Sequence, residues 1–95
     1  MLMVERGRIV ISEHARFEME RRQISEDSAM DVAERPQQLI GAGEGRYVYQ
    51  SRYFDAVEGK EMLLRLVVER READFYLITA YKTSKLEKYW REAQQ

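Results

Sequence analysis

The chain contains no cysteine and only one histidine among its 95 residues. Without cysteine it can form neither a disulfide framework nor a thiolate metal site. With one histidine it also cannot form a zinc motif that needs a pair of histidines. Thiol redox chemistry and the common zinc-binding motifs are therefore excluded as functions.

The chain also lacks an excess of charge of either sign. Its 16 basic and 17 acidic residues give a net charge of -1. A domain that binds nucleic acid through broad electrostatic attraction is normally basic overall. The balance argues against such a binder, although charges gathered on one face would still allow a local basic patch.

Long hydrophobic runs are absent as well. No stretch approaches the roughly 18 apolar residues of a membrane span, and the N-terminal segment MLMVERGR lacks the apolar core of a signal peptide. We therefore expect a cytoplasmic protein with no membrane partner. Hydrophobic residues make up 44% and charged residues 35% of the chain, which is typical of globular domains. Residues 1–95 suffice for one small domain with one core.

The first half of the sequence predicts one strand followed by two helices. Residues 8–11 (RIVI) form a short β-branched run. Ser12 and Ser25 are suited to cap helices, and each is followed by acidic residues that favour a helix N-terminus. Pro36 ends the second helix, because the residue before a proline is disfavoured in helical geometry. Since the helices are short and closely joined, we expect a helical hairpin.

The second half predicts a loop, three strands and a last helix. Residues 39–45 hold three of the five glycines and are expected to be a loop. Segments 46–54, 62–70 and 75–82 alternate or are rich in β-formers, and the turns between them imply an antiparallel meander.

Two features predict the C-terminal helix. Ser84 and Glu87 have capping-box spacing, and an amphipathic pattern follows in Leu86, Tyr89, Trp90 and Ala93. The predicted fold is α+β, in the order β-α-α-β-β-β-α. The helical hairpin and the C-terminal helix would pack on one face of an antiparallel sheet.

Two segments, one near each end, resemble a known family of small prokaryotic domains of unknown function. SEHARFEMERRQISEDSAMDVAERP resembles the family's opening, a Ser/Thr-x-His-Ala-x-x-x-Met helix start followed by an Arg-x-Ile-Ser turn. LITAYKTSKLEKYW resembles its closing signature, a strand ending in Tyr-Lys/Arg-Thr and then a helix rich in Lys, Tyr and Trp. The similarity extends from about residue 11 to residue 90.

This family is similar to the BrnT and RelE/ParE toxins of bacterial toxin–antitoxin systems. Those are small cytoplasmic α+β proteins, many of them metal-independent endoribonucleases, each neutralised by a small antitoxin. The resemblance implies a RelE/BrnT-like fold, an RNA substrate, a cognate antitoxin as partner and no cofactor. The net charge of -1 departs from the pattern, because such toxins are usually clearly basic.

Metal-free RNA cleavage requires proton transfer at the ribose 2′-hydroxyl and at the leaving 5′-oxygen, together with stabilisation of charge on the phosphate. His14 can transfer protons near neutral pH, and the start of a helix favours its neutral form. It can equally be a structural residue. Arg65 interrupts an apolar strand. Either it pairs with a carboxylate such as Glu18, or it binds phosphate in a cleft.

Further candidates lie where the last strand meets the last helix. Tyr81, Lys82 and Lys85 are placed to contact phosphate or a base, although the alternative is a solvated helix start. The tyrosines of segment 46–54, interleaved with Arg46 and Arg52, are suited either to stack on bases or to pack under helices. Packing is the commoner outcome for such a stripe.

Two hypotheses follow. In the first, the protein is a toxin-like endoribonuclease whose catalytic residues His14, Arg65, Lys82 and Tyr81 meet in one electropositive cleft. Arg46, Arg52 and Lys85 would then bind RNA. In the second, the same scaffold is a non-catalytic module that binds a protein partner or forms a homodimer. The near-zero charge and the apolar and tyrosine side chains on both sheet faces favour the second.

Overall fold

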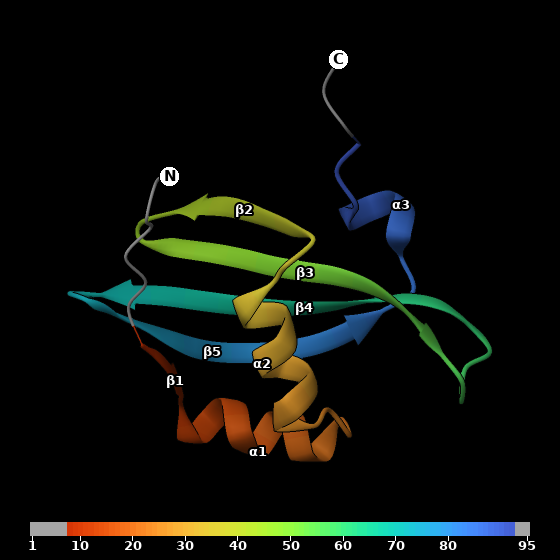
Figure 1. The fold of residues 1–95 in the computed structure, drawn as a ribbon, viewed down its shortest axis with the longest axis horizontal. Coiled ribbons are helices and arrows are strands. Elements are labelled where there is room, and N and C mark those ends of the chain that lie inside the picture. Colours follow the sequence, from red (N-terminus) through yellow and green to blue (C-terminus); the bar gives the residue numbers. More distant parts are fainter. Residues whose placement is uncertain (1–7, 93–95) are drawn as a thin grey trace.

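A computed structural model describes residues 8–92, which form a five-stranded sheet and three helices (Figure 1). In chain order the elements are β1 (Ile9–Ile11), α1 (Glu13–Arg21), α2 (Glu26–Glu34), β2 (Gln38–Gly43), β3 (Arg46–Asp55), β4 (Lys60–Arg71), β5 (Asp74–Thr83) and α3 (Leu86–Tyr89). The strand order in the sheet is β1-β5-β4-β3-β2. The predicted α+β class is confirmed. The sheet is mixed rather than antiparallel, because β1 pairs with β5 in parallel.

The two N-terminal helices begin where the sequence predicts. The side chain of Ser12 accepts a hydrogen bond from the backbone N–H of Ala15 at 3.0 Å. Ser25 accepts one from the N–H of Ser28, also at 3.0 Å. Both bonds satisfy N–H groups that have no partner inside the helix. The second helix stops before Pro36, as expected.

Both helices pack mainly on the sheet, and an ion pair between Arg16 of α1 and Glu26 of α2 joins one helix to the other. α1 contacts β5, and α2 contacts β3 and β4. Figure 1 shows α1 running beside β5 while α2 rises across the sheet. Each helix is amphipathic, and its buried residues join a common core: Ala15 and Met19 from α1, and Ala29, Val32 and Ala33 from α2.

The segment predicted to be a glycine loop is largely a strand. β2 pairs antiparallel with β3 through Leu39, Ile40 and their neighbours. The turn between the strands has positive φ at Glu44 (56°) and Gly45 (75°), as a tight two-residue hairpin turn requires. Small residues have low intrinsic strand propensity. Pairing with β3 therefore decides the structure of this segment, and the loop prediction was wrong.

The core lies between the sheet and the N-terminal helices. Alternate residues of β4 face it, and Leu64, Leu66 and Val68 are almost fully buried. On β3 the tyrosines face the same way: Tyr49 is buried in the core, and Tyr47 and Tyr53 pack against it. The packing interpretation of the tyrosine stripe is therefore confirmed.

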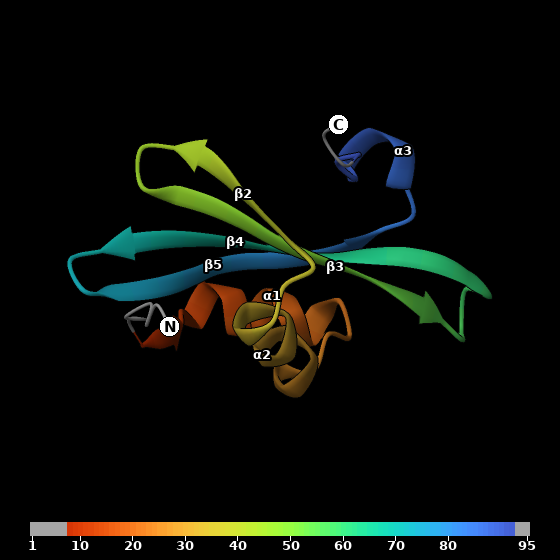
Figure 2. The same cartoon turned by 45° about the horizontal axis from the view of Figure 1, so that its top comes forward.

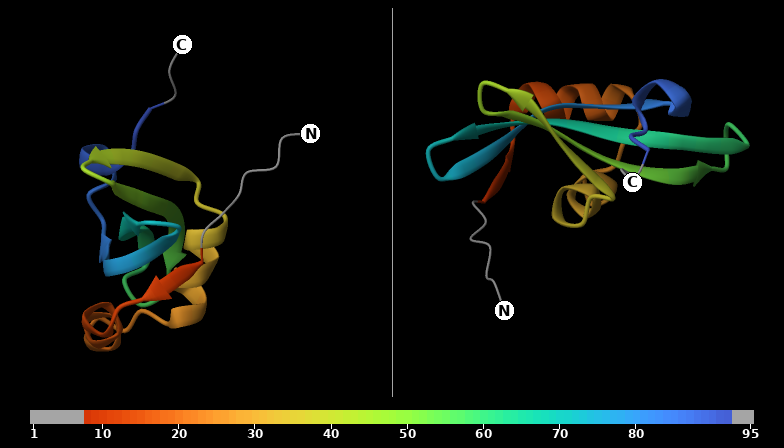
Figure 3. Two further views of the ribbon diagram at one scale, coloured as in Figure 1. Left: turned by 90° about the vertical axis from the view of Figure 1, so that its left-hand side faces the viewer. Right: turned by 90° about the horizontal axis from the view of Figure 1, so that it is seen from above.

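α3 differs most from its prediction. It has four residues and lies across the sheet from α1 and α2 (Figure 2). A view along the strands also places α2 and α3 on opposite sides of the sheet (Figure 3). Lys85, not Ser84, occupies the cap position, and no side chain caps the helix. The helix ends at Tyr89 because Trp90 has extended backbone angles. Ala93 lies outside the described residues.

Candidate anion site on the open face of the sheet

Arg65 occupies the centre of the sheet face that α1 and α2 leave uncovered. It lies on β4 between Leu64 and Leu66. Since successive side chains of a strand point to opposite faces, Arg65 faces away from the core. Its direct neighbours across the sheet are Gln50 on β3 and Tyr81 on β5. The register of three strands therefore brings these three polar side chains together.

The guanidinium of Arg65 is held entirely by neutral groups. Its side chain is almost buried, with 8% of the residue exposed. Nε donates a hydrogen bond to Oε1 of Gln50 at 2.8 Å, and Nη1 donates to the hydroxyl of Tyr81 at 2.7 Å. The ring centroid of Tyr89 lies 3.9 Å from the guanidinium carbon. This ring contact attaches α3 to the sheet.

The amide of Gln50 is fixed in turn by a second set of bonds. Gln50 is fully buried. Its Nε2 donates to Oε1 of Gln38 at 2.7 Å and to the backbone carbonyl of Tyr89 at 3.1 Å. Its oxygen is thereby directed at Arg65, so the guanidinium is oriented by a connected polar network.

No carboxylate pairs with Arg65 among residues 8–92. Glu18, the expected candidate, pairs instead with Arg22 at 2.8 Å and with Arg21 at 3.6 Å. Burying a guanidinium without an acid costs several kcal/mol, of which neutral hydrogen bonds recover only a part. The site thus keeps an uncompensated positive charge, which is the property that an anion-binding site needs.

Tyr89 is a titratable group in contact with this charge. A hydrogen bond with Lys88 lowers the pKa of Tyr89, and the charges of Lys88 and Arg65 and a hydrogen bond with Tyr81 lower it further, against an opposing effect of burial. The Lys88 ammonium lies 5.2 Å from the centroid of the Tyr89 ring. A phenol with a lowered pKa is more available as a proton acceptor near neutral pH.

His14 does not lie in this cluster. It is exposed in the first turn of α1. α1 starts where the N–H of Ser12 bonds to the carbonyl of Leu77. Beyond its far end, Arg22 reaches the carbonyl of Ala80 at 2.8 Å. His14 is therefore at the end of α1 away from Tyr81, roughly 12 Å along the helix axis from Arg22. The expected convergence of His14 with Arg65 is not found.

Lys82 is separated from Tyr81 by the geometry of the strand. It pairs with Leu64 across the sheet, so its side chain is on the core face. There it lines a pocket beside α2. Of the four residues expected to share one cleft, the structure brings together only Arg65 and Tyr81.

The three expected RNA-binding residues have different surroundings. Arg46 forms an ion pair with Glu69 at 3.5 Å. Arg52 pairs with Glu61 at 2.6 Å and lies 5.0 Å from the centroid of the Trp90 ring. Lys85, at the start of α3, has no ion pair in the described part of the chain. Of these three side chains, only that of Lys85 is free of a carboxylate partner.

Gln50 and Tyr89 belong to the cluster but were not predicted to. The position of Gln50 opposite Arg65 depends on the register between β3 and β4. Tyr89 belongs to the closing motif and to the predicted amphipathic helix. No pattern in the sequence indicated that this helix would lie on the other face of the sheet.

Metal and membrane sites were sought in the same range of residues. Within residues 8–92, no three histidine, aspartate or glutamate side chains gather as a metal site would require. No helix in that range is long and apolar enough to cross a membrane.

Comparison with known proteins gives a family but no activity. The family described as "Domain of unknown function (DUF4258)" matches residues 11–82. The match includes Gln50, Arg65 and Tyr81 and ends before α3. No curated protein and no solved structure matches the chain, and nothing in these comparisons links it to the BrnT or RelE/ParE toxins. Because the match covers well over half of the sequence, the chain belongs to the DUF4258 family.

Proposed function

We propose that this domain is a toxin-like, metal-independent endoribonuclease that binds an RNA phosphate at Arg65. The observation that carries the proposal is the nearly buried guanidinium whose two side-chain hydrogen bonds both go to neutral partners. Both ends of the chain resemble a family of small prokaryotic domains that is similar to the BrnT and RelE/ParE toxins, and this similarity adds support. A cognate antitoxin and a cytoplasmic location belong to the same proposal.

The cluster offers a group for each step of the reaction. Arg65 holds the phosphate and stabilises the charge that develops on it. Tyr89 accepts the proton of the 2′-hydroxyl, whose oxygen bonds to phosphorus while the bond from phosphorus to the 5′-oxygen breaks. The Tyr81 oxygen accepts a bond from Arg65, so its proton remains available for the leaving 5′-oxygen. The products are a 2′,3′-cyclic phosphate and a 5′-hydroxyl.

This assignment differs from the sequence-based one. His14 is too far along α1 to serve the reaction at Arg65, and Lys82 is on the other face of the sheet. Tyr89 takes the proton-accepting role first expected of His14. Arg65 keeps the phosphate-binding role that the sequence suggested, whereas Tyr81, first expected to contact phosphate or a base, becomes the proton donor.

RNA reaches the guanidinium when the Tyr89 ring turns aside, because that ring covers it; α3 stays beside the site, so Tyr89 can still accept the proton. α3 has no buried residue, and segments with little buried surface rearrange at low cost in free energy. Lys85 and Lys88 would then be positioned beside the RNA backbone. Their charge would add local attraction despite the net charge of -1.

Induced expression in a bacterial host tests the proposal. Wild type and His14→Ala should arrest growth, whereas Arg65→Met and Tyr81→Phe should not, at equal levels of folded protein. His14→Ala is the matched control, since it removes the residue that a histidine mechanism would need. Arrest by Arg65→Met equal to that by wild type, or no arrest by wild type, would contradict the proposal.

One observation favours a second function, a non-catalytic protein-binding module. β2 is the last strand of the described sheet on its side, and its six residues carry no charge. Such an edge can pair with a strand of another chain. Leu39 on this edge is 53% exposed. If the domain is such a module, Leu39→Lys should abolish its association with another chain, as measured by light scattering. Neither wild type nor any variant should then cleave RNA.

A further inference from the structure

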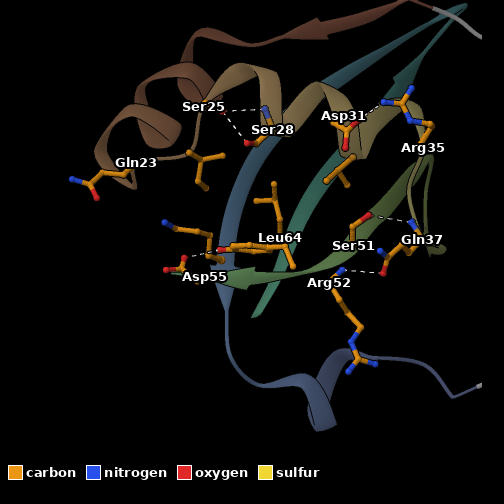
Figure 4. Close-up of a pocket in the computed structure, with 14 residues that line it drawn as sticks. Gln23, Ser25, Ser28, Asp31, Arg35, Gln37, Ser51, Arg52, Asp55 and Leu64 are labelled. Atoms are coloured by element: carbon orange, nitrogen blue, oxygen red, sulfur yellow. Dashed lines mark hydrogen bonds and ion pairs between the residues drawn. The ribbon is translucent and has the colours of Figure 1, made fainter. Parts of the chain in front are cut away.

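A pocket of about 440 Å³ lies between α2 and the sheet, on the face opposite Arg65 (Figure 4). Its walls come from the turn before α2, from α2 itself and from β3, β4 and β5. Ile24, Val32 and Leu64 supply apolar surface and are 6%, 5% and 5% exposed. A pocket of this volume with an apolar lining and a few polar groups is typical of small-molecule sites.

The polar groups around the pocket are mostly bonded to one another. Figure 4 shows Ser25 directed at Ser28, and Asp31 directed at Arg35. The Ser25 and Ser28 hydroxyls are 2.9 Å apart, and Asp31 forms an ion pair with Arg35. The acid on α2 therefore already has a cation as its partner.

The second acid, Asp55, also has hydrogen-bond partners. One of its oxygens accepts the backbone N–H of Glu58 at 2.9 Å, and the other accepts the Tyr53 hydroxyl at 3.2 Å. The bond from Glu58 is the main cause of the lowered pKa of Asp55. The charge of Lys82 contributes the smallest part. Asp55 is thus held by its own turn rather than by the lysine.

Lys82 is the charged side chain of this pocket that lacks a close partner. It is half-buried. No hydrogen bond, and no ion pair within 4 Å, involves it among the described residues. A lysine that is half-buried beside an apolar surface and has no close acid gains from an anion that bonds to its ammonium group.

We propose that this pocket binds a small organic anion. The apolar body of the ligand lies against Ile24, Val32 and Leu64, and its carboxylate or phosphate group bonds to Lys82. The site is separate from the Arg65 cluster, because Lys82 and Tyr81 point to opposite faces of β5. The proposal therefore stands whether or not the domain cleaves RNA.

The test uses 2-naphthoate as the probe and its neutral amide, 2-naphthamide, as the matched control. Amide ¹⁵N–¹H shifts of the full chain are followed during titration with each compound. 2-Naphthoate should shift the amide signals of residues 23–37, 51–55 and 82. The titration should saturate at one bound 2-naphthoate per chain. The amide should bind at least ten-fold more weakly, since it has the same apolar body and no charge.

Three variants assign the binding to particular groups. Lys82→Met should reduce the affinity for 2-naphthoate at least ten-fold and leave the affinity for the amide unchanged. Asp55→Asn, which keeps the acceptor for Glu58, should bind 2-naphthoate as well as wild type or better. Ser28→Trp should fill the pocket and abolish binding of both compounds. Lys85→Met is the control for loss of one surface charge.

Several outcomes would overturn the proposal. They are no shift at these residues at millimolar 2-naphthoate, equal binding of acid and amide, or unchanged binding by a folded Lys82→Met variant. Because the readout is the place and strength of ligand binding, failure here is distinct from absence of RNA cleavage.

Discussion

Arg65 combines a cost in stability with a proposed role in binding an anion. Its nearly buried guanidinium forms hydrogen bonds with Gln50 and Tyr81 but has no acid partner in the described structure. Buried charges are retained where they stabilise a fold through a close partner or where they bind something. Since the close acidic partner is missing, we favour binding.

A stability measurement distinguishes these two roles of Arg65. Arg65→Met should change the free energy of unfolding by no more than about 2 kcal/mol, because the lost hydrogen bonds are offset by the removed desolvation cost. Urea unfolding followed by circular dichroism measures the change. A loss of more than about 4 kcal/mol would instead make the guanidinium a structural group, and the anion-site argument would fail.

Tyr53 gives a prediction about stability at alkaline pH. Burial, followed by the hydrogen bond with Asp55, raises the pKa of Tyr53 to about 12, from 10.0. Since the folded-state pKa is the higher one, this contribution to stability is complete below pH 10 and is lost between about pH 10 and pH 12. The thermal midpoint should therefore fall in that range for wild type, and fall less for Tyr53→Phe. Equal falls in both proteins would contradict the assignment.

Among the secondary-structure elements, the sequence predicted three serine helix caps. Two of these caps are present in the structure and the third is not. Ser12 and Ser25 cap α1 and α2, whereas Ser84 caps nothing. The Ser84 pattern misled because capping-box spacing is short and frequent, and α3 is short and has no fully buried residue.

This difference predicts a contrast between two serine variants. Ser25→Ala should lower the free energy of unfolding by about 1 kcal/mol, the usual cost of losing a cap. Ser84→Ala, its matched control, should change it by less than about 0.5 kcal/mol. Chemical denaturation of both variants measures this contrast. Equal losses would show that Ser84 caps α3 after all.

α3 both covers Arg65 and supplies Tyr89, and two substitutions separate these effects. Tyr89→Phe keeps the ring on the guanidinium and removes the proton acceptor, so RNA binding should persist while cleavage falls at least 100-fold. In wild type the cleavage rate should rise with pH below pH 10, because the lowered pKa of Tyr89 places its phenolate in that range. The rise should be absent in Tyr89→Phe. A pH profile shared by both proteins would exclude Tyr89 as the base.

At the scale of the whole molecule, the sequence predicted what depends on local patterns. The α+β class, α1 and α2, and the faces of β3 and β4 all follow from periodicity, caps or motifs. β2 was missed because its structure depends on pairing with β3, whose paired residues lie 3 to 12 positions away along the chain. The separation of Lys82 from Arg65 depends on register, and the separation of His14 depends on how α1 lies beside β5.

Because the charge of the molecule is balanced, RNA binding is expected to depend on the cations of one sheet face, the face that carries Arg65. With a net charge of -1, attraction to RNA must come from a few unpaired cations rather than from the whole surface. Arg46 and Arg52 have carboxylate partners, whereas Arg65 and Lys85 do not. RNA binding should therefore depend on very few residues.

The most direct test is cleavage of a labelled single-stranded RNA by the purified protein in the presence of EDTA, with Arg65→Met alongside. Wild type should cleave the RNA without a metal ion, to products with a 2′,3′-cyclic phosphate and a 5′-hydroxyl. A folded Arg65→Met variant should react at least 100-fold more slowly. Equal rates for the two proteins, or no cleavage by wild type, would contradict the assignment of Arg65 as the phosphate-binding residue.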